Sequence, residues 1–456
     1  MLLAAVPCDA QRKLSTKVDA YIKAEMQKEK IPGISLAIIR NGKIALLRSY
    51  GLANVEHQVP VKPETVFQSG SIGKQFTAAA VMILVQEGKL SLDDKIAKFF
   101  PDVPPTWSGI TVRHLLNHTS GLGDYPPEIE LARNYTEEQL FEFFKKAPLQ
   151  FEPGARWDYS NVGYVILGNL IRKVTGQFYG DFLQIRIFQP LRMTTARVIS
   201  EADIIPNRAS GYRLLEGVLK NQEWVSPSTN STADGSLYLT VLDMAKWDAA
   251  LYTEQLLKQA SLAQIWNPTT LKDGKRKPYG FGWHTGVIHN RRVVFHGGAW
   301  QGFKSSITRF LDDKVTIIFF ANSWATNDVR LTRGLAAILY PEFSLPPFEP
   351  IEDHEPKITA LVRRVLMELS KGSVTSEPLT SEFRVQLGQK AQKFREMLNS
   401  ISLPVAIIHL SELTDRREEN GQRVYRYMLT DIGKSLSATV KLTKEGKIAA
   451  LELSEL

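Results

Sequence analysis

The feature that most constrains the fold is a pair of apolar, β-branched segments close to the start of the chain. Residues 34–40 and 43–50 are joined by Asn41-Gly42. Both central residues of a type I′ turn need positive φ, which Asn and Gly adopt readily, so the sequence predicts an antiparallel hairpin. The simplest closure is one antiparallel sheet made from both chain ends, with a helical insertion on one side. The later strand-like segments are 293–296, 305–310 and 315–320.

Segments with helical periodicity lie between and beside these strands. Gly88 and Gly176 directly follow two of them, as glycine does where helices end. We therefore expect a mixed α/β (α+β) fold with an antiparallel sheet, flanking helices and a helical subdomain. The predicted helices are 15–30, 71–87, 161–175, 241–252 and 328–339.

A second module follows a proline-rich segment. Residues 341–356 hold five prolines, which is typical of a semi-stiff linker. Beyond it we predict two helices and a four-stranded meander, which form a small α+β domain. The predicted helices are 357–369 and 381–400, and the predicted strands are 405–409, 423–429, 437–442 and 449–453. The expected division is an N-terminal flexible segment or signal-peptide remnant (1–14), a main domain (15–340), the linker (341–356) and an accessory domain (357–456).

Composition excludes several classes of protein. Of the 456 residues, 43% are hydrophobic and 23% charged, which excludes a mainly disordered or fibrous chain. No apolar run approaches the ~18–20 residues that span a membrane, so we expect no integral membrane segment. The net charge of +8 is spread without a dense basic block, so we expect no nucleic-acid partner. Cys8 is the only cysteine, which excludes an intramolecular disulfide and a cysteine-based zinc site.

The first ten residues leave the cellular compartment open. Residues 1–6 are apolar, and Cys8-Asp9-Ala10 has the small-x-small pattern of a signal-peptide cleavage site. This pattern favours a truncated signal peptide and a periplasmic or secreted protein. A frayed N-terminus of a cytoplasmic protein is the alternative, because a chain without disulfides fits either compartment.

A candidate nucleophile opens the helix predicted at 71–87. Ser71 and Lys74 are three residues apart, so their side chains lie on one helical face. A serine hydroxyl needs an adjacent base, and a lysine is such a base only when burial or a second cation lowers its pKa. The helix N-terminus adds N–H groups and positive potential that suit an oxyanion. The alternative is a helix-capping serine beside a solvated lysine, because this spacing often occurs by chance.

Two further polar residues stand at the start of the helix predicted at 161–175. Tyr159 can move a proton as a phenolate or through Lys74, and Asn161 can orient an amide or ester carbonyl. The alternatives are a buried tyrosine with a satisfied hydroxyl and an asparagine that caps the helix.

A run of small residues follows the strand at 293–296. In His296-Gly297-Gly298-Ala299 the glycines allow a substrate backbone to approach closely, and the N–H of Ala299 can be a second oxyanion donor. His296 offers hydrogen bonding and a pH-dependent charge. The alternative is a turn at the strand end with an incidental histidine.

A metal site is not expected. His114 and His118 are four residues apart on a predicted helix, but no glutamate lies between them, so the zincin pattern fails. We expect neither a metal nor another cofactor. His118 and Trp300 are interpreted instead as residues at the rim of the site.

The motifs Ser-x-x-Lys, Tyr-x-Asn and His-x-Gly occur in this order along the chain. In this set the chain resembles the serine β-lactamase and penicillin-binding protein superfamily, over about residues 15–340. Within it the chain is most similar to the class C β-lactamase-like esterases, D-aminopeptidases and DD-peptidases. The supporting stretches are 67–80, 115–122, 153–168, 233–247 and 295–303.

The resemblance implies a role for each motif residue. Ser71 would be the acylated nucleophile and Lys74 its partner base. Tyr159 would act as general base in acylation and as general acid toward the leaving group. Asn161 would bind the carbonyl side of the substrate, and the backbone N–H groups of Ser71 and Ala299 would form the oxyanion hole.

His296 is the main departure from the family pattern. It stands where many β-lactamases have the lysine of Lys-Thr-Gly. A mostly neutral histidine binds a substrate carboxylate less well than a permanent cation, so efficient β-lactam turnover is not expected. The C-terminal module resembles a cystatin-type or nuclear-transport-factor-type accessory domain by fold analogy alone.

The sequence thus predicts a serine hydrolase that cleaves a small ester, amide or peptide substrate through an acyl-Ser71 intermediate. A carboxylesterase is the first interpretation, and a D-amino-acid peptidase or amidase or a weak β-lactamase is the alternative. A non-hydrolytic penicillin-binding sensor is the alternative from another class. A homo-oligomer formed through the C-terminal domain is a further expectation.

Overall fold

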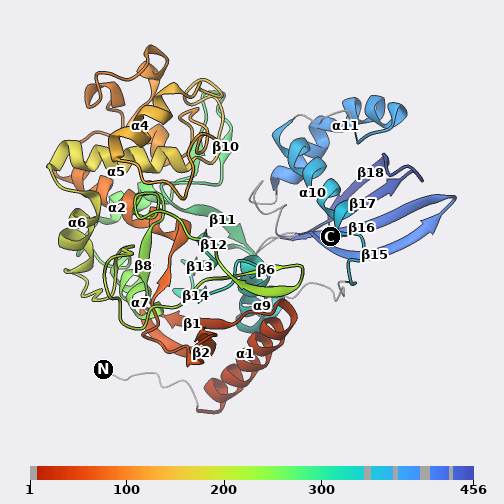
Figure 1. Ribbon diagram of the computed structural model, residues 1–456, viewed down its shortest axis with the longest axis horizontal. Helices are drawn as coiled ribbons and strands as arrows, with labels where there is room; N and C mark the ends of the chain where they lie inside the picture. Colours follow the sequence, from red (N-terminus) through yellow and green to blue (C-terminus); the bar gives the residue numbers. More distant parts are fainter. Residues whose placement is uncertain (1–7, 344–350, 373–377, 401–410, 431–434, 456) are drawn as a thin grey trace. The chain divides into compact units, whose positions relative to one another are not determined.

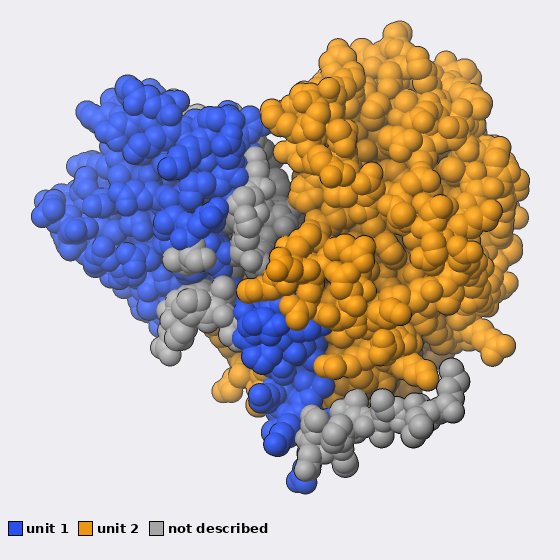
Figure 2. All heavy atoms as spheres, turned by 180° about the vertical axis from the view of Figure 1, so that it is seen from behind, with its two compact units in different colours: residues 1–18, 329–456 blue, residues 19–328 orange. Residues whose placement is uncertain are grey.

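The computed structural model describes residues 8–343, 351–372, 378–400, 411–430 and 435–455. These residues form two compact units (Figures 1 and 2). One unit consists of residues 19–328, and the other consists of the described residues of 1–18 and 329–456. The domain boundaries expected from the sequence, 15–340 and 357–456, stay a prediction, and the prolines at 346, 347 and 350 lie outside the described residues.

The larger unit is built around one antiparallel sheet in which both ends of this part of the chain meet. Strand β1, from the start of the chain, pairs with β14 from Ile34↔Ala321 to Arg40↔Val315. This pairing confirms the sheet predicted from the sequence. Along the sheet the strands are β11 (His284–Ile288), β12 (Arg291–Trp300), β13 (Phe303–Phe310), β14 (Val315–Ala321), β1 (Gly33–Arg40), β2 (Lys43–Asn54) and β3 (Val59–Pro60).

The turn between β1 and β2 has the backbone that its sequence requires. Asn41 and Gly42 have φ of 51° and 70°, the positive values of a type I′ turn. Strand β11, by contrast, is not recognisable in the sequence. It spans five residues, contains Gly286, and leaves Val287 67% exposed, so no apolar alternation marks it.

Helices cover the sheet and form a helical subdomain (Figure 1). The predicted helices are confirmed, and four of them have bounds within three residues of the prediction. The observed helices are α1 (Cys8–Glu29), α2 (Lys74–Gln86), α5 (Asn161–Thr175), α7 (Val241–Ala250) and α9 (Asp328–Leu339). The first helix begins at Cys8, seven residues before its predicted start and inside the segment expected to be flexible. Shorter helices are α3 (Val112–Leu116), α4 (Glu137–Lys146), α6 (Tyr179–Leu183) and α8 (Gln259–Ile265), and a π-turn spans Gln184–Phe188.

Helix α2 lies at the centre of the unit. It is buried from Lys74 to Leu84 and packs against α5, α6 and α8. A helix that is apolar on every side belongs in a core, and this one explains why its first residue, a lysine, is withdrawn from water. The predicted helix at 71–87 begins with a 3₁₀ turn, Gly70–Gly73, and becomes an α-helix only at Lys74.

Small sheets brace the region before α2. Strand β8 (Leu237–Leu239) lies between β4 (Phe67–Gln68) and β5 (Arg197–Val198). The backbone N–H of Ser69 donates to the carbonyl of Leu237 across 2.8 Å, so this sheet holds the segment that leads into the 3₁₀ turn. The remaining short strands are β6 (Tyr212–Leu215), β7 (Val218–Asn221), β9 (Thr269–Thr270) and β10 (Arg276–Lys277).

The C-terminal part of the chain has its own sheet and its own core. The predicted pair of helices is present as α10 (Pro356–Lys371) and α11 (Ser381–Ser400). The predicted strand at 405–409 lies outside the described residues, and the charged strand β15 was not expected. The strands follow one another in the sheet as β15 (Ser411–Glu419), β16 (Gln422–Thr430), β17 (Ser435–Leu442) and β18 (Ile448–Glu455).

Candidate active site

Ser71 lies in the 3₁₀ turn that precedes α2. In a 3₁₀ helix residues i and i+3 eclipse, so the turn brings the side chain of Lys74 next to that of Ser71. The Nζ of Lys74 donates to the Oγ of Ser71 across 3.1 Å. The predicted Ser–Lys pair is therefore brought together, with the serine partly exposed and the lysine buried.

The backbone around Ser71 approaches two other segments so closely that only glycine fits. A Cβ on Gly70, which has a φ of +52°, would lie 2.4 Å from the backbone nitrogen of Ala299. A Cβ on Gly298 would lie 2.1 Å from the carbonyl oxygen of Ser69, and one on Gly235 would lie 2.5 Å from that of Gly70. The C-terminal part of β12 and the 3₁₀ turn are therefore in backbone contact.

Two serine hydroxyls hold this contact in place. The Oγ of Ser305, on β13, donates to the carbonyl of Ser69 across 2.6 Å. The Oγ of Ser69 in turn donates to the carbonyl of Gly235 across 2.7 Å. Ser71, whose N–H is one predicted oxyanion donor, follows Ser69 in the chain. Ala299, which carries the other, is on β12, next to Gly298, which pairs with Ser305 of β13.

Lys74 makes two further hydrogen bonds. Its Nζ donates to the Oδ1 of Asn161 across 2.7 Å and to the carbonyl of Asp234 across 2.5 Å. Burial lowers the pKa of Lys74 to about 8, against the opposing charges of Asp234 and Asp124. Roughly a tenth of the amine is therefore neutral at pH 7.

The neutral amine has one possible orientation in this setting. The amide oxygen of Asn161 and the carbonyl oxygen of Asp234 can only accept hydrogen bonds. They therefore accept from both N–H groups of a neutral Lys74 amine. The lone pair of the nitrogen then points to the Oγ of Ser71. This arrangement can remove the serine proton.

Tyr159 stands on the other side of the amine. The Nζ of Lys74 lies 4.9 Å from the centre of the Tyr159 ring. Burial raises the pKa of Tyr159 well above its ordinary value, while the neighbouring Ser71 lowers it. Within the described parts of the chain, the enclosed hydroxyl of Tyr159 has Ser71 as a polar neighbour but makes no well-formed hydrogen bond. It is a proton donor held beside the Ser–Lys pair.

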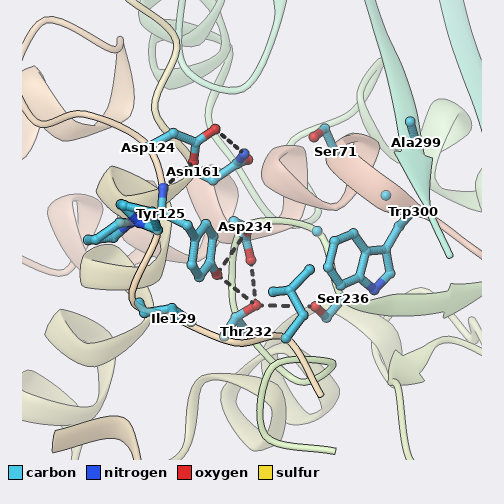
Figure 3. A pocket seen from close by; sticks show the side chains of 15 residues that line it. Ser71, Asp124, Tyr125, Ile129, Asn161, Thr232, Asp234, Ser236, Ala299 and Trp300 are labelled. Atoms are coloured by element: carbon cyan, nitrogen blue, oxygen red, sulfur yellow. Dashed lines mark hydrogen bonds between the residues drawn. The ribbon is translucent and has the colours of Figure 1, made fainter. Parts of the chain in front are cut away.

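A cavity of about 430 Å³ opens over Ser71 (Figure 3). In Figure 3, Ala299 and Trp300 lie on one side of it, and Asp124, Tyr125 and Asn161 lie on the other. Trp300 lines the cavity, and its indole nitrogen donates to Asn230. The lining residues are Gly70, Ser71, Asp124, Tyr125, Pro126, Pro127, Ile129, Leu131, Asn161, Thr232, Asp234, Gly235, Ser236, Ala299 and Trp300.

The polar part of this cavity is acidic. Two carboxylates, Asp124 and Asp234, line it, and its lining residues include no lysine or arginine. The Nδ2 of Asn161 donates to Asp124 across 3.1 Å, and the hydroxyl of Thr232 donates to Asp234 across 2.6 Å (Figure 3). Burial raises the pKa of Asp234, although the charge of Lys74 lowers it. Such a cavity attracts a cationic group and repels a carboxylate.

The two predicted histidines are placed differently from the expectation. His118, expected at the rim, is 1% exposed and does not line the cavity. His296, expected to contact substrate, is 3% exposed and lies behind Ala299 on β12. Burial lowers the pKa of His296 to about 3, so the ring is neutral near pH 7. Gly297 and Gly298 also lie outside the cavity lining. Gly298 allows the β12 backbone to approach the carbonyl oxygen of Ser69.

Sequence analysis missed Asp124, Tyr125, Asp234 and Tyr279. Asp124 comes after Gly121-Leu122-Gly123, and Asp234 precedes Gly235, so both occur in glycine-containing loops without catalytic spacing. Tyr279 starts the stretch Tyr-Gly-Phe-Gly-Trp, whose alternating glycines are the one local signal of a close packing requirement. These side chains reach the site through tertiary contacts.

The described residues hold neither a metal-binding cluster nor a membrane-spanning helix. No group of three or more His, Cys, Asp or Glu side chains there is arranged to hold a metal ion. No helix within the same residues is long and apolar enough to cross a membrane.

Comparison with known proteins gives a family match over most of the chain. Residues 18–340 match the family described as Beta-lactamase. A penicillin-binding protein of Bacillus subtilis (strain 168) is 31% identical over 317 residues, which are 65% of this chain and 69% of that protein. A D-aminopeptidase of Gluconobacter oxydans (strain 621H) is 27% identical over 334 residues. This match covers 71% of this chain and 62% of that protein, so the chain spans less than two thirds of the aminopeptidase.

Two solved structures are similar in fold. The octameric penicillin-binding protein homologue from Pyrococcus abyssi has a TM-score of 0.65 and 22% identity, and the match covers 97% of this chain and 98% of that one. The D-amino acid amidase from Ochrobactrum anthropi SV3, in complex with L-phenylalanine amide, has a TM-score of 0.64 and 25% identity. That match covers 73% of this chain and all of the amidase chain.

Proposed function

The chain belongs to the beta-lactamase family and is a serine hydrolase of the β-lactamase and penicillin-binding protein fold, and on this premise we propose that it cleaves amide bonds after a D-amino-acid residue with a free amino group. The observation that carries the proposal is the acidic cavity over Ser71, lined by Asp124 and Asp234. A free ammonium group is attracted to such a cavity, whereas a substrate carboxylate is repelled. The names of a D-aminopeptidase and a D-amino acid amidase among similar proteins support the D configuration.

In the proposed reaction, neutral Lys74 removes the proton of Ser71 as the Oγ attacks the substrate carbonyl. The N–H groups of Ser71 and Ala299 bind the oxyanion, where one such donor lowers the barrier by roughly 3–4 kcal/mol. Tyr159, next to the amine of Lys74, donates a proton to the leaving nitrogen. Water then attacks the acyl-Ser71 ester by the same route in reverse and releases the amino acid.

A second candidate is the carboxylesterase that the sequence favoured. The neutral ring of His296 supports it, because an ester substrate needs no cation at this position. An uncharged ester gains nothing from the acidic cavity, however, so the amide substrate with a free amino group is preferred here.

The deciding experiment compares four chromogenic substrates at equal concentration. They are D-phenylalanine p-nitroanilide, its L enantiomer, its N-acetyl derivative and p-nitrophenyl butyrate. The proposal expects kcat/KM for the free D-anilide to exceed that of the N-acetyl derivative at least tenfold, since acetylation removes the charge. Equal rates for both, or cleavage of the ester alone, would contradict it. Ser71→Ala is the control and must abolish every hydrolysis.

We also propose assembly of several copies through the C-terminal domain. The similarity to the octameric Pyrococcus abyssi protein extends over 97% of this chain, including the C-terminal part. Light scattering on the full chain tests this proposal, and a mass of 51.3 kDa, that of one copy, would contradict it. Export to the periplasm or the medium remains a proposal that cell fractionation can test.

A further inference from the structure

The hydroxyl of Tyr279 lies between two buried histidine rings. It is 3.1 Å from the Nε2 of His118 and 3.1 Å from the Nε2 of His296. The three side chains are at most 3% exposed. Neither histidine has a direct role in the proposed reaction, and no sequence motif includes Tyr279.

The proton position on His118 follows from its other neighbour. The backbone N–H of Ser160 donates to the Nδ1 of His118 across 3.2 Å. A backbone N–H can only donate, so Nδ1 carries no proton and a neutral His118 carries its proton on Nε2. His118 therefore donates to the hydroxyl oxygen of Tyr279.

The proton position on His296 follows by the same logic from the opposite side. The Nδ1 of His296 is 2.6 Å from the carbonyl oxygen of Gly297. A carbonyl can only accept, so Nδ1 carries the proton and Nε2 is an acceptor. Tyr279 therefore donates its hydroxyl proton to the Nε2 of His296, and the whole chain of hydrogen bonds has a single direction.

We propose that Tyr279 is a positioning residue that holds His296 in its neutral form with the proton on Nδ1. Through this chain it joins Ser160, which lies between Tyr159 and Asn161, to Gly297 on the strand that carries Ala299. The inference rests on the proposed function in so far as these neighbours are the catalytic groups. Because both ring nitrogens of His296 are engaged within the protein, His296 does not bind substrate but aligns the strand.

The direction of the chain also opposes the protonation of His296. A proton on Nε2 would turn this acceptor into a second donor facing Tyr279, whose oxygen already accepts from His118. The hydroxyl oxygen would then accept from both histidines, and the hydroxyl proton of Tyr279 would lose the acceptor that Nε2 of His296 provides. The hydrogen bonds therefore favour the neutral form of His296, as its burial does.

Other titratable groups face this cluster and are retained in every variant below. The ring of His284, on β11, lies 4.6 Å from that of Tyr279 and 5.1 Å from that of His296. The hydroxyl of Tyr164, on α5, donates to the carbonyl of Leu116 across 2.7 Å and is also a polar neighbour of the Tyr279 hydroxyl, whose pKa burial and Tyr164 both raise. The ring centre of Tyr159 lies 6.2 Å from that of His296. Besides burial, the charge of Lys74 lowers the pKa of His296, and the carboxylate of Asp328 faces Gly297.

The first test reads the proton positions directly in the full-length wild-type chain. Nitrogen NMR of ¹⁵N-histidine-labelled protein at pH 7 distinguishes a protonated from a bare ring nitrogen, and His118→Gln and His296→Gln assign the signals. We expect a protonated Nδ1 and bare Nε2 in His296, and the reverse in His118. A proton on Nε2 of His296, or on both of its nitrogens, would overturn the proposal.

The second test removes the hydroxyl and keeps the ring. In Tyr279→Phe we expect the pKa of His296, followed by NMR, to rise by at least one unit, and kcat/KM to fall about tenfold. The matched control is Tyr212→Phe, since Tyr212 is also buried and its hydroxyl also makes two polar contacts, with the N–H of Val55 and with Glu56. An unchanged His296 titration in Tyr279→Phe would overturn the proposal.

The two proposals fail in different ways. A wild-type chain that cleaves no D-aminoacyl substrate refutes the proposed function, while the tautomers of His118 and His296 still decide the role of Tyr279. If Tyr279→Phe does not fold, the wild-type spectrum alone gives that decision.

Discussion

The amine of Lys74 donates to the hydroxyl of Ser71 across 3.1 Å at the start of the most central helix of the larger unit. The burial of that helix is what lowers the pKa of the amine to about 8. Only the deprotonated amine accepts the serine proton, so activity must increase as the pH rises through this value. We expect kcat/KM to rise about tenfold per pH unit below pH 8. For a substrate with a free amino group it should fall again above about pH 8, where that group loses the charge that the acidic cavity attracts.

A pH profile of kcat/KM from pH 5.5 to 10 checks this prediction. The control is Lys74→Gln, which keeps a hydrogen-bonding side chain but cannot act as a base near neutral pH, and which should leave a residual rate without this limb. A wild-type profile that falls between pH 6 and 8 would rule out Lys74 as the base.

The charge of Asp124 is predicted to select the substrate. Its carboxylate accepts from the Nδ2 of Asn161 and lines the cavity beside Ser71. In Asp124→Asn the ammonium group of a D-aminoacyl anilide loses a charged partner, so we expect kcat/KM for that substrate to fall about tenfold. The rate for the N-acetyl derivative should stay within about twofold, and an equal loss for both substrates would show that Asp124 acts only on Asn161.

The close backbone contact at Gly298 is predicted to be essential for catalysis. A Cβ there would lie 2.1 Å from the carbonyl oxygen of Ser69 and 2.3 Å from the Oγ of Ser305, so Gly298→Ala must push β12 away from the 3₁₀ turn. We expect kcat to fall at least a hundredfold, because the two oxyanion donors separate. Gly286→Ala on β11 is the matched control, since its Cβ would meet nothing closer than 3.5 Å. Similar activities of the two variants would contradict the assigned oxyanion hole.

The sequence predicted the sheet and the helices where local signals are strong. Asn41-Gly42 marks a turn by its backbone needs, and Gly176 ends α5 with a φ of +74°. Strand β15 was missed because its sequence, Ser-Glu-Leu-Thr-Asp-Arg-Arg-Glu-Glu, has a charged pattern typical of solvent-exposed chain. Such a strand is specified by its partner β16 and not by its own residues.

The candidate site likewise combines residues that a local pattern joins with residues that only tertiary contacts bring together. Ser71 and Lys74 are three residues apart, and one turn of helix is enough to join them. Asp234 reaches Lys74 from 160 positions along the chain, and Tyr279 reaches His118 from 161 positions away. No local pattern contains such contacts. The neutral state of His296 also depends on burial, which the sequence alone does not give.

A buried ion pair under the main sheet yields the last prediction, which concerns stability. The Nε of Arg309, on β13, donates to the Oδ1 of Asp248, on α7, across 2.7 Å, and both side chains are fully buried. The same oxygen accepts from the hydroxyl of Thr316 on β14, also across 2.7 Å. Removing one partner leaves the other charge buried without compensation, so we expect Arg309→Met to lower the free energy of unfolding by about 3–5 kcal/mol. Denaturant unfolding of the full chain measures this loss.

The control is Arg292→Met, which breaks an exposed pair with Asp312 and should lower the free energy of unfolding by less than about 1 kcal/mol. Equal losses in the two variants would mean that the buried charge of Asp248 is compensated from elsewhere. Activity per folded molecule should be retained in Arg309→Met, because the pair takes no part in the site at Ser71.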